Sequence, residues 1–480
     1  MTAFLTALAV LIAGYFLYSA VIDRLMATRR DAPVPAVTKA DGVDFVVLPT
    51  WKVFLIQFLN IAGLGPIFGA IMGIMFGPAA FLWIALGTIF AGAVHDYLSG
   101  LVSLREGGVS LPEIIGVNLG RRVKTVTMVF SVVLLLLVGA VFILTPAGLL
   151  AGMTPESFDR TFWICVIFAY YLLATLLPID KLIGNLYPLF GFALLFMAAG
   201  LLGVLIFGDV TIPVSFGQLG EYESSLPVFP MMFVSIACGA ISGFHATQSP
   251  MMARCLKSET LARPIFYGAM VAEGVVALIW AAAAVAFTGG YEGLTDYMAQ
   301  DGHSAGSLVT DISRGWLGTF GGVLALLGVI AAPITTGDTA LRSARLILAD
   351  FMRFDQKAFW RRIAVTLPLF ALVFGIMMID FNVLWRYFAW SNQTLAVFTL
   401  WAMAVYMARK RLPYVIAMLP AMFMTVVSVT YLCYAPRPEG LGLGMGVGLG
   451  LSVVAVAIMC GLFMRMLSRM RPEAGALPNR

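Results

Sequence analysis

Charged residues are scarce in this sequence. Only 11% of the 480 residues are Asp, Glu, Lys or Arg, whereas soluble domains carry about 25%. This scarcity excludes a soluble enzyme and a disordered chain, and the modest net charge of +5 implies no nucleic-acid partner. The five cysteines form no CxxC pair and no His/Cys spacing, so they predict no metal centre.

Several catalytic signatures are also missing. The sequence contains no HExxH, GxSxG or P-loop motif, so nothing in it indicates a metalloprotease, a serine hydrolase or an ATP-driven pump. No segment between the apolar runs is long enough to fold as a separate signalling domain. We therefore expect neither an enzyme nor a bound cofactor.

Hydrophobic residues, by contrast, make up 61% of the chain. They gather in runs of about 20 residues, the length of a membrane-spanning helix, which also excludes an outer-membrane barrel with alternating strands. The sequence therefore predicts an all-α polytopic membrane protein. The longest runs, 51–76 and 316–348, are expected to bend or break. The thirteen predicted spans lie near 3–22, 51–76, 79–104, 125–149, 161–178, 187–207, 227–250, 265–289, 316–348, 360–379, 382–408, 413–434 and 441–464.

The basic residues fall almost entirely on one side of these spans. Of the 30 Lys and Arg residues, 26 lie in or beside the segments that follow odd-numbered spans. Arg160, Arg314 and Arg437 lie on the other side, and Arg386 lies inside a span. Because cytoplasmic loops are enriched in Lys and Arg, the basic side is expected to be cytoplasmic. The N-terminus is then outside the plasma (inner) membrane and the C-terminus inside the cell.

Polar residues interrupt four of the apolar runs. In the second span, Gly63 and Gly65 permit unwinding and Pro66 cannot donate a hydrogen bond, so we expect a break, with a proline kink and a glycine packing face as the alternative. A polar stretch over 242–250 closes the seventh span, and residues 332–339 and 390–394 interrupt the ninth and eleventh. Irregular backbone at membrane depth needs protein or water to cover it, so these interruptions predict the lining of a substrate pathway.

The spacing of the breaks predicts an inverted repeat. The breaks in the second and seventh spans lie five spans apart, so two groups of five spans, 51–207 and 227–408, cross the membrane with opposite polarity. An inverted 5+5 repeat with a broken first helix in each half is a common plan among secondary transporters. We expect one transmembrane domain over 1–480, with an extra helix and cytoplasmic linker in 1–50 and two extra helices and a tail in 413–480.

Ionisable residues inside the spans are candidate coupling sites, because charges at membrane depth are costly and usually pair or function. Asp96 lies in the third span, His245 in the seventh, Glu273 in the eighth and Asp338 in the ninth. A structural ion pair with the arginines four and seven residues further along the same helix face is the alternative for Asp338.

The repeat also predicts which interruptions meet. The first and eighth helices of such a core are commonly neighbours, which places the break of the second span beside Thr335, Thr336 and Asp338 in the ninth. Their oxygens suit a sodium ion, or Asp338 carries a proton; no other metal site is predicted. Half-helix N-termini suit a substrate carboxylate, and His245 suits a proton or an anion.

At these same interruptions the sequence resembles the carbon starvation protein A (CstA) family. The matching stretches are 63–66, 90–96, 242–245, 335–340 and 391–393, in the family's order. The resemblance implies a LeuT-like core of the amino acid–polyamine–organocation type. It also implies a plasma-membrane transporter, made during carbon or nutrient starvation, that imports peptides or pyruvate with ion coupling. Family members often have glutamine where this chain has His95.

The hypothesis is therefore secondary active uptake of a small carboxylate-bearing solute, a peptide or pyruvate, coupled to H⁺ or Na⁺. An ion channel is the alternative, although the sequence has no evident acidic ring or carbonyl-filter repeat. The expected partners are the solute, the coupling cation and membrane lipid. The expected substrate contacts are Gly63, Gly65, His245, Thr247, Gln248, Asn392 and Gln393, and the expected ion-coupling residues are Asp96, Glu273, Thr335, Thr336 and Asp338.

Overall fold

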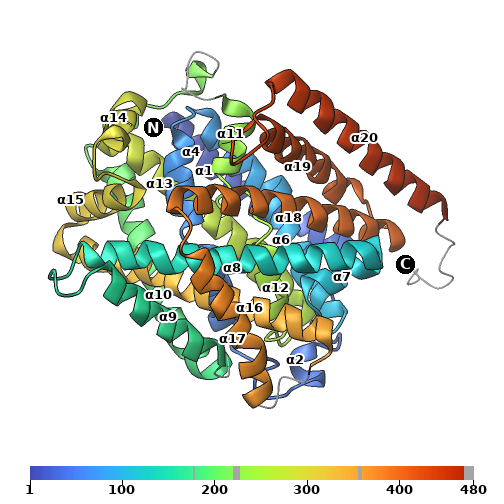
Figure 1. Cartoon of the computed structure of the whole chain (residues 1–480). Helices are drawn as coiled ribbons and strands as arrows, with labels where there is room; N and C mark the ends of the chain where they lie inside the picture. The colour runs from blue at the N-terminus through green and yellow to red at the C-terminus, as the bar shows by residue number, and fades with distance from the viewer. Residues whose placement is uncertain (177–178, 220–226, 355–358, 470–480) are drawn as a thin grey trace.

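The computed structural model describes residues 1–176, 179–219, 227–354 and 359–469, and all secondary structure in these ranges is helical (Figure 1). Residues 177–178 of the fifth predicted span and the tail from 470 lie outside the described residues. The helices of the first part of the chain are α1 (Thr2–Met26), α2 (Pro35–Thr38), α3 (Thr50–Ile61), the π-helix η1 (Gly65–Gly69), α4 (Ala70–Ile74), α5 (Ala79–Leu82), the π-helix η2 (Trp83–Gly92), α6 (Ala93–Arg105), α7 (Leu111–Leu119), α8 (Arg121–Ala151), α9 (Arg160–Leu176) and α10 (Ile179–Phe207).

The second part of the chain continues in the same way. The segment 290–315, between the eighth and ninth predicted spans, is largely helical, because it contains α14 and the start of α15. The helices are the 3₁₀ turn η3 (Phe216–Gln218), α11 (Val228–Ser235), α12 (His245–Ala253), the 3₁₀ turn η4 (Glu259–Leu261), the π-helix η5 (Arg263–Tyr267), α13 (Gly268–Phe287), α14 (Tyr291–Ala299), α15 (Ala305–Ala325), the π-helix η6 (Leu326–Ile330), α16 (Ala331–Met352), α17 (Phe359–Ile376), α18 (Phe381–Arg409), α19 (Val415–Tyr434) and α20 (Met445–Arg469).

Many of these helices have the length and composition of membrane spans. Within the described ranges, eight qualify singly, and ten qualify if each of two bent pairs counts as one span. Long apolar helices satisfy their backbone hydrogen bonds internally, as a bilayer requires. The prediction of a multi-pass helical membrane protein is confirmed. The expected bends in the two longest runs are also present, at 53° between α3 and η1–α4 and at 59° between α15 and α16.

The first predicted break is present. Helix α3 ends at Ile61, residues 62–64 are not helical, and the chain resumes as η1 at Gly65. Pro66 lies in the first turn of η1, where its missing N–H leaves no helical hydrogen bond unmade. The chain therefore crosses this region as two half-helices rather than as one kinked helix.

The second break lies slightly earlier than the polar stretch at 242–250 suggested. Helix α11 ends at Ser235, residues 236–244 are not helical, and α12 then runs from His245 to Ala253. The polar residues 245–249 therefore begin the second half-helix instead of closing the first. The helical structure in the predicted span 227–250 accordingly extends to Ala253.

The other two predicted interruptions are wrong as breaks. Helix α16 continues through Thr335 and Asp338, and α18 continues through Asn392. In α16 the threonine hydroxyls donate back to carbonyl groups of their own helix, as Thr335 Oγ1 does to Ala332 O at 2.8 Å. Such back-bonding satisfies a polar side chain at membrane depth without opening the helix.

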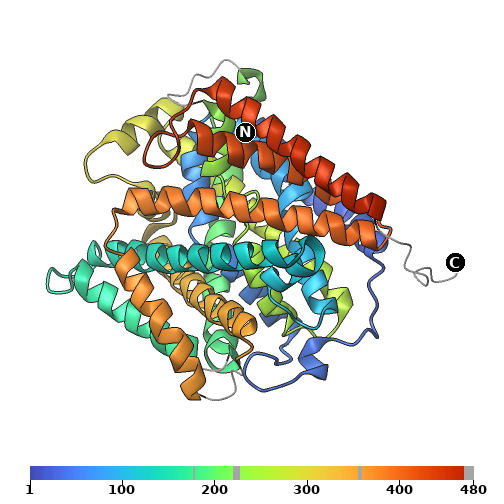
Figure 2. The ribbon, with the colours of Figure 1, turned by 45° about the vertical axis from the view of Figure 1, so that its right-hand side comes forward.

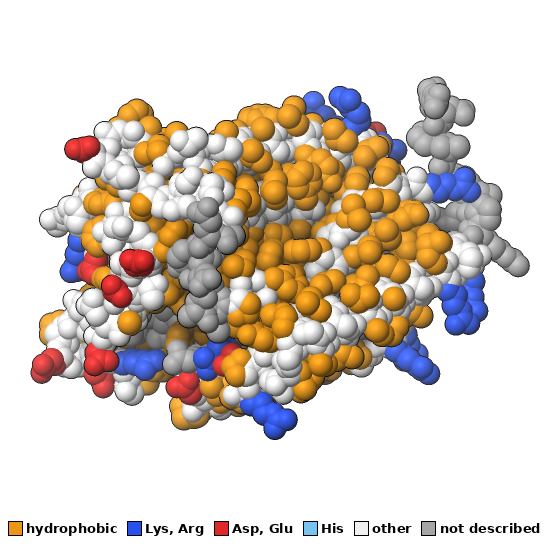
Figure 3. All heavy atoms as spheres, turned by 90° about the horizontal axis from the view of Figure 1, so that it is seen from above, with side chains coloured by type: hydrophobic (Ala, Val, Ile, Leu, Met, Phe, Trp, Pro, Cys, Tyr) orange, Lys and Arg blue, Asp and Glu red, His pale blue; other side chains and the backbone are white. Residues whose placement is uncertain are grey.

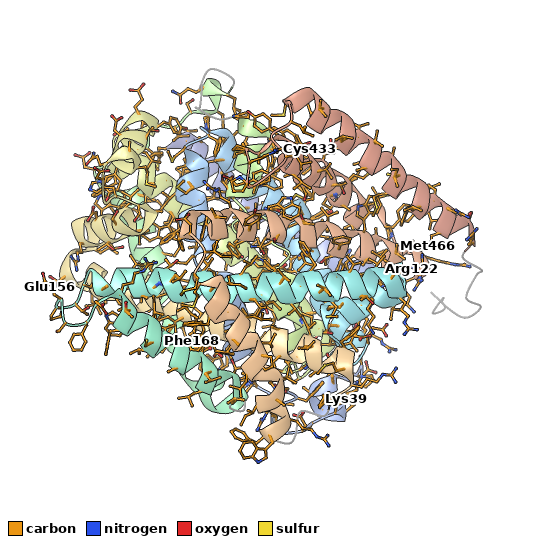
Figure 4. The ribbon with its side chains drawn as sticks, viewed as in Figure 1. Lys39, Arg122, Glu156, Phe168, Cys433 and Met466 are labelled. Atoms are coloured by element: carbon orange, nitrogen blue, oxygen red, sulfur yellow. The ribbon has the colours of Figure 1, made fainter. Side chains whose placement is uncertain are left out.

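The helices pack around a central layer. Helices α8 and α18 lie side by side across the front of the molecule, with α16 packed against α8, and α19 and α20 stacked beyond α18 (Figures 1 and 2). The face seen in Figure 3 carries a broad apolar belt. Acidic side chains gather toward one end, together with a few basic ones, and the other end carries mainly basic side chains. Glu156 lies at the acidic end, and Arg122 and Lys39 lie toward the basic end (Figure 4).

Candidate functional site: the crossing of two broken helices

Glycines bring the two breaks into direct contact. A Cβ atom added to Gly65 would overlap the Cys238 side chain of the second break, and one added to Gly69 would lie 2.8 Å from Ser235 O. Gly63 faces the Phe142 ring and Thr336 Oγ1, at 2.9 and 3.2 Å from an added Cβ. The predicted substrate contacts Gly63 and Gly65 are thus packed against protein in this conformation, where they permit close backbone approach.

Asn392 of α18 holds the second break in place. Its Oδ1 accepts hydrogen bonds from Ser242 Oγ at 3.0 Å and from the Phe244 backbone N–H at 3.1 Å, and its carbonyl oxygen accepts from Gly243 N–H at 3.0 Å. Only glycine fits at 243, because a Cβ there would overlap the backbone of α18 at Ala396. The amide groups before α12, expected to hold a substrate carboxylate, are therefore occupied by Asn392.

The neighbouring predicted substrate contacts also bond within the protein. Gln393 Nε2 donates to Phe233 O at 3.0 Å, which ties α18 to α11. Gln248 Nε2 donates to Thr247 Oγ1 at 2.9 Å, and Thr247 Oγ1 donates to Phe244 O at 2.6 Å. These side chains surround the second break, and Thr247 and Gln248 also face α16 through Ser343.

Four ionisable side chains meet beside the crossing. His95 and Asp96 lie at the start of α6, directly after the π-helix η2, an irregularity that often accompanies functional sites. His95 Nδ1 lies 2.8 Å from Asp96 Oδ1, and His245 Nδ1 lies 3.1 Å from Asp96 Oδ2. On its other edge, His245 Nε2 lies 3.6 Å from Glu273 Oε2 of α13. The structure thus brings together Asp96, His245 and Glu273, which the sequence analysis predicted as separate candidate residues.

This cluster is fully enclosed and incompletely hydrogen-bonded. All four side chains have 0% relative exposure. Both carboxylate oxygens of Glu273 and the Nε2 atoms of both histidines have no hydrogen-bond partner among the described protein atoms. Burying an ionised carboxylate without a partner costs several kcal/mol or more, so such a group binds a proton, a cation or a ligand.

Asp338 forms a second buried acidic site. Tyr187 of α10 donates a hydrogen bond to Asp338 Oδ2, while Asp338 Oδ1 has no partner among the described protein atoms. The guanidinium groups of Arg342 and Arg345 approach Asp44, each at 3.6 Å from its Oδ1. Both arginines also interact electrostatically with Asp338. The ion pair along its own helix therefore stays a prediction, beside the tyrosine contact from another helix.

The predicted proximity of the ninth span to the first break is present. Thr336 Oγ1 lies 2.9 Å from Leu59 O, at the end of α3, and 2.9 Å from Ala332 O. The backbone carbonyl of Thr335 accepts from Tyr187 Oη at 3.3 Å, and the same hydroxyl group contacts Asp338. Oxygen atoms suited to a cation thus gather here. Within the described residues, however, no group of three or more His, Cys, Asp or Glu side chains is arranged to hold a metal ion.

Some residues of the site were not anticipated. Gln57 and Asn60 are fully buried in α3 just before the first break, and both Asn60 side-chain polar atoms lack a partner among the described protein atoms. They are polar residues three positions apart in an apolar run, a pattern from which a buried polar site could have been predicted. Tyr187 and Asp44 gave no signal, because their partners are more than 140 residues away in the sequence.

The comparisons with known proteins decide the family. The model of the family "Carbon starvation protein CstA" matches residues 1–157 and 153–316. The chain belongs to the CstA family. The match confirms the resemblance in the stretches 63–66, 90–96 and 242–245, whereas 335–340 and 391–393 lie beyond the matched residues.

Several curated proteins are similar to this chain over part of its length. An uncharacterized membrane protein of Haemophilus influenzae is 42% identical over 338 residues, covering 60% of this chain and 91% of that protein. The peptide transporter CstA of Helicobacter pylori is 27% identical (55% of this chain, 48% of that protein), and the pyruvate/proton symporter BtsT of Escherichia coli is 28% identical (55% and 46%). The chain spans about half the length of these two transporters.

Solved structures show the fold of this CstA-family chain. A manganese transporter of Eremococcus coleocola matches with a TM-score of 0.54 at 12% identity, covering 89% of this chain and 98% of that protein. Mhp1, a nucleobase-cation-symport-1 family transporter, matches with a TM-score of 0.50 at 15% identity, covering 89% and 94%. The fold is therefore that of LeuT-like transporters, and the named relatives and these structures are transporters rather than enzymes.

Proposed function

We propose that this protein is a secondary active transporter of the inner membrane that imports a small carboxylate-bearing solute, a peptide or pyruvate, during carbon or nutrient starvation. Coupling to H⁺ or Na⁺ drives the uptake. The names of the CstA and BtsT relatives support the solute class, and the LeuT-like fold supports alternating access as the mechanism.

One observation carries the proposal. Where the two broken helices cross, fully buried polar side chains of α3, α12 and α13 keep atoms without hydrogen-bond partners among the described residues, including Asn60, His245 and Glu273. Leaving buried polar atoms unsatisfied costs about 1–3 kcal/mol each, so a fold retains them where a ligand or ion uses them. A polar interior at the meeting point of two half-helices suits a solute that passes through the protein.

The proposed topology follows the same elements. We propose thirteen spans, with α1 in front, α19 and α20 behind, and the inverted repeats 51–207 and 227–408 between them. The first half-helix pairs of the two repeats, α3 with η1–α4 and α11 with α12, are the ones whose breaks touch. The basic end carries the C-terminal end of α20 and is taken as cytoplasmic, which leaves the N-terminus outside.

Residue roles are proposed from this geometry. The substrate region comprises Gly63, Gly65, His245, Thr247, Gln248, Asn392 and Gln393, with the glycines and Asn392 shaping the breaks. Thr335, Thr336 and Asp338 form the candidate sodium site or an additional proton site, and Asp96 and Glu273 are the other coupling residues. An ion channel remains the second candidate, and saturation of flux with solute distinguishes the two.

The test uses the purified full chain. A thermal-shift panel contains pyruvate, other short 2-oxo acids, dipeptides and tripeptides, at two pH values with and without Na⁺. The true solute should raise the melting temperature, because binding at 100 times its Kd adds about 2.7 kcal/mol to the free energy of unfolding. In proteoliposomes, the same solute should accumulate above equilibrium when an ion gradient is imposed. Flux that only equilibrates and never saturates would contradict the transporter and favour a channel.

A further inference from the structure

Three ionisable side chains form one line through the buried interior. The two ring nitrogens of His245 face two carboxylates, since Nδ1 lies 3.1 Å from Asp96 Oδ2 and Nε2 lies 3.6 Å from Glu273 Oε2. The three residues come from α6, α12 and α13 and are all fully buried. We call Asp96, His245 and Glu273 the proton line.

The geometry of the proton line fixes how many protons it holds. A neutral imidazole carries one N–H, so it donates to only one of the two carboxylates. At the other junction a ring lone pair faces a carboxylate oxygen, and this contact is repulsive unless a proton lies between the two atoms. His95 Nδ1 also lies 2.8 Å from Asp96, which suits Asp96 to remain the charged acceptor. The additional proton therefore belongs to the His245–Glu273 pair.

We propose that His245 and Glu273 of the proton line hold the coupling proton between them, so that this pair, and not Asp338, is the coupling site. This inference rests on the proposed uptake function and specifies its coupling site. A hard cation such as Na⁺ prefers oxygen ligands, whereas the partner that faces Glu273 is an imidazole nitrogen. The proposal also assigns His245 to proton coupling in place of substrate contact.

The position of His245 connects the proton to helix movement. His245 is the first residue of α12, directly after the non-helical segment 236–244, whereas Glu273 lies inside the continuous helix α13. The 3.6 Å separation is already longer than a hydrogen bond, so a small rotation of α12 closes or opens it. Opening leaves both groups without their shared proton partner, and the proton departs as the half-helix moves.

The surroundings of the proton line contain few other charges. The titratable groups that face it are His95 on α6 and the Cys238 thiol on the segment between α11 and α12, which interacts with Glu273. In the described part of the chain, no lysine or arginine forms an ion pair with Asp96, His245 or Glu273. No fixed positive charge therefore takes the place of the proton.

The test separates exchange from accumulation in proteoliposomes that contain the full chain. Radiolabelled pyruvate and radiolabelled alanyl-alanine serve as probes. In Glu273→Gln the amide can still donate to His245 Nε2 but cannot release a proton, so substrate counterflow should persist while accumulation driven by a pH gradient falls to the level seen without one. Glu113→Gln, a matched change on α7 that contacts only Lys124 among the described ion pairs, should behave as wild type.

The outcomes distinguish this inference from the proposed function. Wild-type counterflow that follows a Na⁺ gradient and ignores pH would overturn proton coupling and leave the transporter intact. Absence of saturable counterflow in the wild type would instead remove the proposed function itself. Loss of pH-driven accumulation in Asp338→Asn but not in Glu273→Gln would move the coupling site to α16. If Glu273→Gln does not fold, proton uptake on pyruvate or alanyl-alanine binding, measured in weakly buffered wild-type protein, tests the same claim, and its absence contradicts it.

Discussion

At the scale of single residues, the site depends on small side chains as much as on ionisable ones. Gly65 and Gly243 allow two irregular backbone segments to touch each other and α18. Asn392 then satisfies the polar groups that this irregular backbone exposes, through its Oδ1 and its carbonyl oxygen. Because the bilayer offers no water to unpaired backbone groups, such partners are required wherever a helix opens at membrane depth.

Gly65→Ala should therefore destabilise the protein. The added Cβ overlaps Cys238, so one segment must shift, and overpacking of this kind costs about 1–3 kcal/mol. The measurement is the melting temperature of the purified variant. Gly148→Ala in α8 is the matched control, because an added Cβ there meets no atom within 4 Å, and it should leave the melting temperature unchanged or raise it slightly. The double variant Gly65→Ala/Cys238→Gly should recover part of the loss, and equal stability of both single glycine variants would contradict the close crossing.

At the scale of elements, local chemistry made some features predictable and tertiary contacts hid others. The break at Gly63–Pro66 was predictable because glycine and proline act on their own backbone. The supposed breaks at Thr335 and Asn392 were wrong, because polar side chains in an apolar run can also bond within or between intact helices. Asp96, His245 and Glu273 were each found as charges at membrane depth, but their meeting depends on the packing of three helices that no local pattern encodes.

A connecting segment at the basic end of the molecule is held by contacts with two helices, α16 and α12. Residues 39–49 connect α2 to α3, and there Asp41 Oδ1 accepts from three successive backbone N–H groups at 2.8–2.9 Å. This turn presents the buried Asp44 to Arg342 and Arg345 of α16. Further along, Leu48 N–H donates to Cys255 O at 3.2 Å, so the segment also covers the end of α12.

Asp44→Asn should loosen this segment. The substitution removes the anion beside two buried guanidinium groups, and breaking a buried ion pair typically costs about 3–5 kcal/mol. We expect faster maleimide labelling of Cys255, which is buried in the native protein, with the exposed Cys165 as the internal reference. Peptide mass spectrometry of detergent-purified protein reads both sites. Asp31→Asn, at an exposed position before α2, should not change the ratio, and an unchanged ratio in Asp44→Asn would show that the ion pair does not hold the segment.

At the scale of the whole molecule, the fold is shared far more widely than the residues that act in it. A manganese transporter and Mhp1 match 89% of this chain at 12–15% identity. A fold shared at that distance fixes where a site lies but not what it binds, so function has to be argued from the side chains at the crossing. The asymmetry of charge between the two ends is likewise a property of the whole chain, and it sets the expected orientation.

Orientation can be tested with two cysteines at opposite ends of one helix region. Arg122 lies at the start of α8 and Glu156 lies just beyond its end, both exposed and on opposite ends of the molecule (Figure 4). Because the basic end is taken as cytoplasmic, a membrane-impermeant maleimide should label Glu156→Cys in intact cells and Arg122→Cys only after permeabilisation, each above the signal of the parent chain. Labelling in the reverse order would invert the proposed orientation. Equal labelling of both in intact cells would mean that α8 does not separate the two sides, which would undo the thirteen-span topology and the inverted repeat built on it.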